Sequence, residues 1–196
     1  MNARWLGFIL VLLLIAQIGT AKTMGFCQNL NSLQGNQFKN ESSNESPFTL
    51  PVTGLLIRKD IRRLYLLHLN KILKSYPVAL GVRPRGHKQK QGDLKTPEGV
   101  YFINQKKQDS SYHLSLKISY PNAQDIVEAN MKGVHPGGDI FIHGLPNEAG
   151  LKKKLLSGIH PVIDWTLGCV AVTDEEIEEI YSQVQLGTPI EICPLQ

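Results

Sequence analysis

The sequence predicts a mainly β fold, either a curved mixed sheet or a β-sandwich, with a few short helices. Short apolar runs bounded by turn residues recur along the chain, as is typical of strands. Between Tyr112 and Tyr120 apolar and polar residues alternate, which is the period of a strand with one buried face. Because helical patterns are few, the elements indicate a mainly β domain.

Taken in order, the expected strands lie at residues 55–57, 63–69, 72–80, 99–103, 112–120, 139–143, 168–172 and 189–193. A basic loop separates the third and fourth of these, over residues 83–95. Short helices are expected at 122–131 and 150–157. A stronger helix starts at Thr173, which has capping-box spacing to Glu176. Its apolar stripe begins at Ile177, and Gly187 ends it.

The 196 residues suffice for one globular domain with short appendages. Arg4 precedes an apolar run over residues 5–16, and Gly19 and Ala21 follow it with cleavage-site spacing. Residues 1–21 therefore predict a secretory signal peptide, because the run is short for a membrane span. An uncleaved anchor is the alternative. We expect an exported protein of the periplasm or cell envelope, with no stable membrane span after cleavage.

Residues 22–50 are rich in Asn, Ser, Gln and Gly, which predicts a linker or irregular arm. The globular domain then occupies residues 51–196. The formal net charge is only +4, and no basic run is interleaved with aromatics, so no nucleic-acid partner is expected.

Three cysteines follow the predicted cleavage site: Cys27, Cys169 and Cys193. An odd number in an exported protein leaves at least one unpaired thiol or an intermolecular bond. Cys27 and Cys193 lie near the two ends of the mature chain. They either pair with each other or are small buried side chains.

Two short stretches combine residues suited to acyl transfer: residues 142–144 (Ile-His-Gly) and residues 164–170 (Asp-Trp-Thr-Leu-Gly-Cys-Val). A cysteine nucleophile needs a base, because a thiol with a pKa of about 8.5 is mostly protonated at neutral pH. His143 on a neighbouring strand is a candidate base for Cys169. From these residues alone, a buried structural thiol and a strand histidine fit equally well.

The surrounding motifs resemble the L,D-transpeptidase catalytic domain of the YkuD type. His143-Gly144, followed by residues 166–171 (Thr-Leu-Gly-Cys-Val-Ala), resembles the family's His-Gly pair and its Ser/Thr-x-Gly-Cys block. Residues 92–99 (Gly-Asp-Leu-Lys-Thr-Pro-Glu-Gly) resemble its upstream Thr-Pro motif. The resemblance covers about residues 54–193, nearly the whole mature domain.

This resemblance implies an enzyme of peptidoglycan synthesis, cell wall biogenesis and cell shape. Cys169 would attack the carbonyl of the third stem-peptide residue and expel the terminal D-alanine, and an amine or water would resolve the thioester. His143 is the implied proton donor and acceptor, and Gly168 the implied backbone oxyanion site. Gly144, Thr166 and Thr96 are expected at the substrate pocket. For the two threonines, a role in satisfying the backbone or building a turn is the alternative.

The sequence departs from the family's commonest block, Ser-His-Gly-Cys followed by a hydrophobic residue and Arg. Leu167 replaces the second histidine, and Ala171 replaces the arginine. An Asp164-Trp165-Thr166 start is typical of a divergent branch. Two alternatives therefore stay open: a murein peptide amidase or L,D-carboxypeptidase with the same two residues, and an inactive peptidoglycan-binding module.

A metal site is not expected. His135, Asp139 and His160 can be grouped with His143, but their spacing matches no standard zinc pattern. The resemblance implies no cofactor either, since the thiol and the imidazole supply the chemistry.

Overall fold

The computed structural model describes residues 25–27, 50–147 and 151–195. The predicted signal peptide and most of the predicted arm lie outside the described residues. Within these ranges, no helix combines the length and apolar character that crossing a membrane requires.

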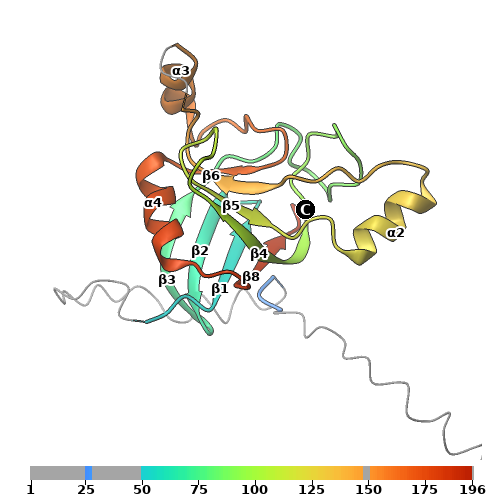
Figure 1. Ribbon diagram of the computed structural model, residues 1–196, viewed down its shortest axis with the longest axis horizontal. Helices are drawn as coiled ribbons and strands as arrows, with labels where there is room; N and C mark the ends of the chain where they lie inside the picture. Colours follow the sequence, from blue (N-terminus) through green and yellow to red (C-terminus); the bar gives the residue numbers. More distant parts are fainter. Residues whose placement is uncertain (1–24, 28–49, 148–150, 196) are drawn as a thin grey trace, which may run out of the picture.

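Eight strands form one mixed sheet in the order β3-β2-β1-β8-β4-β5-β6-β7 (Figure 1). Most neighbours are antiparallel, but β1 runs parallel to β8 and β6 runs parallel to β7. The bounds are β1 Gly54–Arg58, β2 Arg63–His68, β3 Lys71–Pro77, β4 Gly99–Lys107, β5 Ser115–Ile118, β6 Phe141–His143, β7 Val170–Ala171 and β8 Pro189–Cys193.

The sheet curls until its two ends meet. Ala79, two residues beyond β3, forms an antiparallel bridge with Ala171 of β7. Both backbone hydrogen bonds of this bridge are present, at 3.0 and 2.8 Å. A second bridge joins Gly81 to Thr166. The expected curved mixed sheet is therefore confirmed, and its closure brings the segment after β3 against the segment that contains Cys169.

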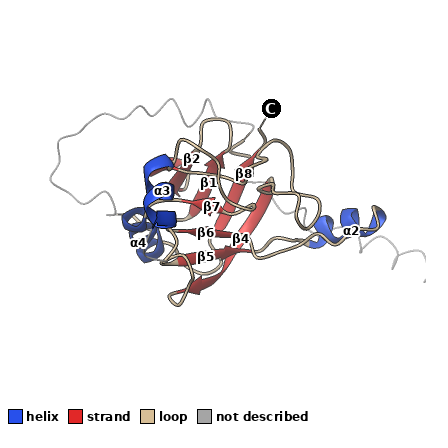
Figure 2. Cartoon of the chain, turned by 90° about the horizontal axis from the view of Figure 1, so that it is seen from above, coloured by secondary structure: helices blue, strands red, loops and turns tan. Residues whose placement is uncertain are grey.

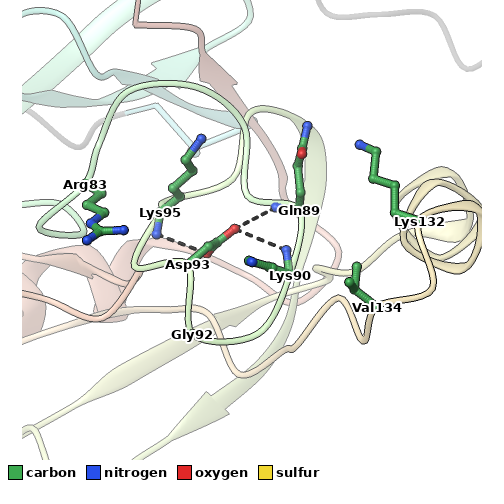
Figure 3. A pocket seen from close by; sticks show the side chains of 8 residues that line it. All are labelled: Arg83, Gln89, Lys90, Gly92, Asp93, Lys95, Lys132 and Val134. Carbon is green, nitrogen blue, oxygen red and sulfur yellow. Dashed lines mark hydrogen bonds between the residues drawn. The ribbon is translucent and has the colours of Figure 1, made fainter.

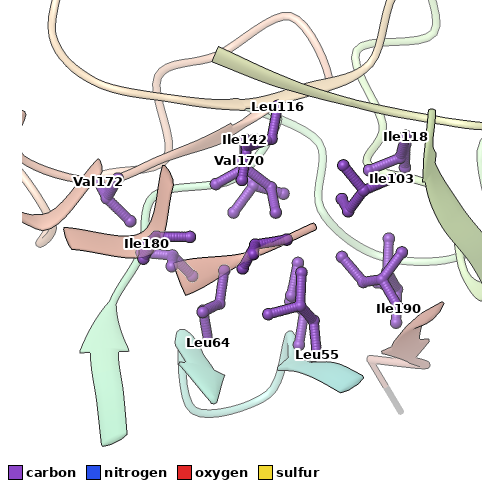
Figure 4. Close-up of a cluster of buried hydrophobic side chains, with 14 of the residues drawn as sticks. Leu55, Leu64, Ile103, Leu116, Ile118, Ile142, Val170, Val172, Ile180 and Ile190 are labelled. Atoms are coloured by element: carbon purple, nitrogen blue, oxygen red, sulfur yellow. The ribbon is translucent and has the colours of Figure 1, made fainter. Parts of the chain in front are cut away.

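The concave side of the curl holds the hydrophobic core. Figure 4 shows apolar side chains from opposite parts of the sheet meeting there, with Leu55 and Leu64 facing Leu116 and Ile142. All four are fully buried. Because each buried aliphatic side chain contributes about 1.5–3 kcal/mol, this core supplies the main force that holds the curl.

Helix α4 (Asp174–Gln183) begins at the predicted capping box. The Thr173 hydroxyl accepts from the Glu176 amide at 3.2 Å, and the Glu176 carboxylate accepts from the Thr173 amide at 2.9 Å. Ile177 and Ile180 are fully buried in the core, as the apolar stripe predicts. The helix thus covers one end of the curl and fixes the chain immediately after β7.

Two other helices stand out from the sheet: α2 (Ala123–Met131) and α3 (Leu151–Ile159). Figures 1 and 2 place α2 and α4 at opposite ends of the molecule. The predicted helices at 122–131 and 150–157 agree with α2 and α3 to within two residues where the chain is described.

Several predicted strands are longer than the observed ones, and the runs at 112–120 and 168–172 differ most. The run at 112–120 contributes only β5, because His113 adopts a left-handed φ of 55° and the chain bends there. The run at 168–172 contributes only β7, because Gly168 has a φ of 135°. Both interruptions lie beside Cys169 or His143 along the sheet, where the backbone leaves the regular ladder.

A disulfide joins Cys27 to Cys193, with 5.3 Å between their Cα atoms. It ties the N-terminal segment to the end of β8. The Glu191 carboxylate accepts from the Phe26 amide at 2.9 Å and strengthens the same junction. Cys169 is then the free thiol of the three cysteines.

Candidate active site

The pairing of β6 with β7 brings Cys169 close to His143. Ile142 pairs with Val170 and His143 with Ala171, so Cys169 lies one position before the ladder, next to Phe141. Because side chains alternate along a strand, those of Cys169 and His143 emerge on the same face. Both line one cavity of about 240 Å³. The two residues singled out from the sequence thus share a site.

His143 is held in one orientation and one tautomer. Its Nδ1 lies 2.7 Å from the carbonyl oxygen of Gly144, which can only accept, so Nδ1 carries the proton and Nε2 is the basic nitrogen. Burial is the main cause that lowers the pKa of His143 to about 4, and nearby His160 lowers it further, against the effect of the Gly144 carbonyl. At neutral pH the imidazole is uncharged and able to accept a proton.

The Cys169 thiol is half-buried and protonated at rest. Its Sγ lies 3.6 Å from the carbonyl oxygen of Asp139, to which the thiol donates. Burial raises the pKa of Cys169, and the charge of Asp139 adds to this, while a backbone hydrogen bond with Phe141 and the charge of Lys88 oppose it. A neutral thiol beside a neutral imidazole suits proton transfer during attack, not a preformed ion pair.

The loop before Cys169 is fixed by Asp164 and Thr166. The Asp164 carboxylate accepts from the Leu80 amide at 2.9 Å and from the Arg62 guanidinium at 2.7 Å. The Thr166 hydroxyl donates to the Cys169 carbonyl at 2.7 Å and accepts from the Gly168 amide at 3.1 Å. Thr166 therefore orients the backbone of the cysteine, and its contacts with substrate stay a prediction.

Gly168 is required by the backbone at this point. Its φ of 135° is rarely adopted by other residues, and a Cβ there would lie 2.7 Å from the Lys95 carbonyl oxygen. Its amide already donates to Thr166, so an oxyanion role for this N–H requires exchange of that bond. The close packing of residues 95 and 168 also holds the basic loop against the cysteine.

The contacts of Thr96 and Gly144 are structural. Thr96 is fully buried, and its hydroxyl accepts from the Gly81 amide at 3.0 Å. A Cβ on Gly144 would lie 2.7 Å from Asp174 Oδ1, which explains the glycine by packing against α4. Neither residue lines the cavities at Cys169.

Two further features were not predicted, one in the site and one outside its cavities. The ring of Tyr112 packs against that of His143 in a tilted arrangement, with 4.4 Å between ring centroids, and Tyr112 lines the same cavity. Lys59 is fully buried and donates to Glu98 at 2.7 Å and to the carbonyls of Gly86 and Thr96 at 3.1 Å. The alternation at 112–120 gave a signal for Tyr112 as an inward residue, but Lys59 carries no local signal.

Cys169 also lines a second cavity, of about 510 Å³. Lys88, His135 and Leu167 are among its lining residues, whereas serines and Tyr112 line the cavity shared with His143. The thiol is therefore accessible from two cavities of different chemistry.

A sheet closed on itself, with a buried histidine and a free cysteine at its edge, defines a candidate cysteine acyl-transferase site. The chain belongs to the YkuD family, described as the L,D-transpeptidase catalytic domain, whose model matches residues 53–192. The family expected from the motifs around His143 and Cys169 is thereby confirmed.

Two similar proteins place the chain further. The protein named "Putative L,D-transpeptidase YafK" of Escherichia coli K12 is 33% identical over 116 residues, covering 58% of this chain and 38% of that protein. The crystal structure of the helical cell shape determining protein Pgp2 from Campylobacter jejuni has a TM-score of 0.54 at 25% identity, covering 74% of this chain and 49% of that one. The chain thus spans less than half the length of these relatives.

Proposed function

We propose that this protein is an L,D-transpeptidase that acts on peptidoglycan stem peptides through a thioester at Cys169, with His143 as its base. The observation that supports this most is the shared cavity of a free thiol and a neutral histidine whose Nδ1 is already engaged. Membership of the L,D-transpeptidase family supports the choice of substrate.

In the proposed first step, Nε2 of His143 takes the thiol proton as Sγ attacks the peptide carbonyl carbon. The oxyanion that forms needs backbone N–H donors, and Gly168 contributes if its bond to Thr166 is exchanged. When the intermediate collapses, His143 returns the proton to the leaving amine and the thioester remains. An acceptor amine then attacks the thioester and gives its proton to His143. The new amide forms as the C–S bond breaks, and His143 returns the proton to Sγ, which regenerates the thiol.

Hydrolysis is the second candidate, since water can replace the acceptor amine. It is favoured by the two departures from the commonest motif. Ala171 is fully buried, and its backbone N–H and C=O are both hydrogen-bonded to Ala79, so the family's arginine has no counterpart there. Leu167 presents an exposed apolar side chain at the second cavity that Cys169 lines.

Function in an oxidising compartment is supported by the disulfide between Cys27 and Cys193, because such bonds persist in exported proteins and are rare in the cytosol. We therefore propose export to the periplasm or cell envelope, as the sequence of residues 1–21 predicts.

The test of the nucleophile is stoichiometric acylation by a carbapenem, followed by mass spectrometry. We expect one adduct on wild type, located on Cys169, and none on Cys169→Ser. The matched variant His143→Gln keeps the thiol but removes the base, and we expect it to acylate about 100-fold more slowly. A folded wild-type protein that resists acylation would support the inactive binding module instead.

The products formed from muropeptides show whether an amine or water resolves the thioester. Dimers joined through the third stem residues indicate transpeptidation. Shortened monomers alone indicate hydrolysis and would contradict the proposed transpeptidation. Both product sets should vanish in Cys169→Ser.

A further inference from the structure

A third cavity, of about 510 Å³, lies between the basic loop and the end of α2. Its lining includes four cations, Arg83, Lys90, Lys95 and Lys132. Figure 3 shows Arg83 at one end of this cavity and Lys132 at the other, with Lys95 between them. Within residues 25–27, 50–147 and 151–195, none of the four side chains forms an ion pair or hydrogen bond.

The acidic residue of this lining, Asp93, does not neutralise them. Its carboxylate accepts from the backbone amides of Gln89, Lys90 and Lys95 at 2.8, 3.1 and 3.2 Å (Figure 3). Its remaining contact is the ion pair with buried Lys88, at 2.8 Å. Burial raises the pKa of Asp93, but these hydrogen bonds outweigh it and keep the pKa below its ordinary value. Asp93 therefore shapes the loop, and the cavity retains a surplus of positive charge.

This cationic cavity adjoins the one at Cys169. Gly92 lines both, and the second cavity reaches from Gly92 and Lys88 to Cys169. Gly168 packs against the Lys95 carbonyl, so the loop is held in place relative to the thiol. A peptide whose carbonyl lies at Sγ can extend its neighbouring residues over the loop.

We propose that the cavity between loop 83–95 and the end of α2 is an anion subsite that binds carboxylate groups of the peptide processed at Cys169. The proposal rests on the proposed function for the identity of that peptide. Four unpaired cations around one concave surface attract anionic groups before contact and hold them after it. In the cavity beside His143, one cation, Lys107, is balanced by one acid, Asp139. The difference in charge between the two cavities therefore also sets which end of the peptide faces which cavity.

The test measures binding of a stem peptide by calorimetry to Cys169→Ala protein, which cannot turn it over. One peptide keeps its free carboxylates, and a second has them converted to amides. We expect the amide form to bind about tenfold more weakly, the range set by a few exposed charge pairs. The double variant Arg83→Gln/Lys132→Gln should weaken binding of the carboxylate form about equally and leave the amide form unchanged.

The matched control is Lys71→Gln/Lys154→Gln, which removes the same charge at exposed positions that line none of the three cavities. It should leave both affinities unchanged. Since all four substituted side chains are at least partly exposed, folding is not at risk. The carboxylate preference should also weaken as salt rises from low to physiological concentration.

Equal affinity for the two peptides, or equal effects of the two double variants, would overturn the subsite. Competition by polyphosphate without a carboxylate preference would reassign the cavity to a phosphate polymer and overturn it as well. Turnover by the wild-type protein is read separately. Selective binding without turnover refutes the proposed function alone, whereas turnover without selectivity refutes the subsite alone.

Discussion

The carboxylate of Asp164 accepts a hydrogen bond from the backbone N–H of Leu80 at 2.9 Å and forms an ion pair with Arg62 at 2.7 Å. It lies five residues before Cys169 and joins the loop of the cysteine to the segment after β3. The same two segments are paired through Ala79 and Ala171. Asp164 therefore positions the loop of the cysteine where the two ends of the sheet meet, which we call the seam.

Replacing Asp164 should loosen this seam. We expect Asp164→Ala to lower the free energy of unfolding by about 2 kcal/mol, because it removes charge-assisted hydrogen bonds. Acylation of Cys169 should slow about 100-fold, since small displacements of a reacting group are costly. Denaturant unfolding and adduct mass spectrometry measure the two effects.

The control is Asp60→Ala, which breaks the more exposed pair between Asp60 and Arg58. Because exposed pairs contribute about 0–1 kcal/mol, it should change neither quantity appreciably. Equal acylation by the two variants would mean that Asp164 has no part in placing the thiol.

A methyl group at residue 168 should be far more harmful than one at residue 187. Both glycines have left-handed φ values, 135° and 81°, but a Cβ on Gly168 meets the Lys95 carbonyl at 2.7 Å, whereas one on Gly187 meets nothing within 4 Å. We expect Gly187→Ala to cost about 1 kcal/mol of stability through the backbone alone. Gly168→Ala should cost at least about 2 kcal/mol more and stop acylation. Similar melting temperatures for the two variants would contradict this packing.

At acid pH, the rate of Cys169 acylation should follow the protonation of His143. Because burial lowers the pKa of His143 to about 4, the imidazole stays neutral through most of the acid range. The rate should therefore be level between about pH 5 and 7 and fall tenfold per unit below about pH 4. Stopped-flow acylation at constant ionic strength measures this profile. A midpoint near 6.5 would show that His143 is not desolvated in the working protein.

The same shift predicts a dependence of stability on pH. The unfolded chain binds a proton at His143 near pH 6.5, and the folded chain only near pH 4. Stability is therefore full above pH 6.5 and is lost as the pH falls toward 4, by an order of 3 kcal/mol. In His143→Gln this part of the loss should be absent, so the difference between the two unfolding curves isolates it. A constant difference across this range would contradict the assigned shift.

Local signals explain why much of this fold was predictable. The Thr173–Glu176 capping box and the apolar stripe from Ile177 located α4 because a helix start depends on residues three apart. Strand limits failed where one residue breaks the ladder, as at His113 and Gly168, because a left-handed φ leaves little trace in apolar periodicity.

The contacts that could not be predicted from the sequence join residues that are far apart along the chain. Arg62 and Asp164 lie 102 residues apart, and Lys59 reaches Glu98 across 39 residues. Such pairs depend on how the sheet closes, which no spacing along the chain records. Cys169 and His143 were predicted as site residues because their flanking motifs resemble a known family, and their catalytic roles stay a prediction. The tautomer of His143 required the position of the Gly144 carbonyl.

Loss of the Cys27–Cys193 disulfide should lower stability without altering the chemistry. The bond closes a loop with a sequence separation of 166, and neither cysteine lines the cavities at Cys169. We expect Cys27→Ser/Cys193→Ser to lose roughly 2–5 kcal/mol of unfolding free energy. At a temperature where the variant stays folded, its Cys169 should acylate at the wild-type rate. As a control, reductant should lower the stability of wild type but leave that of the double variant unchanged. Stability that is insensitive to reductant in both proteins would mean that the bond does not constrain the fold, and slower acylation in the folded variant would mean that it also positions the site.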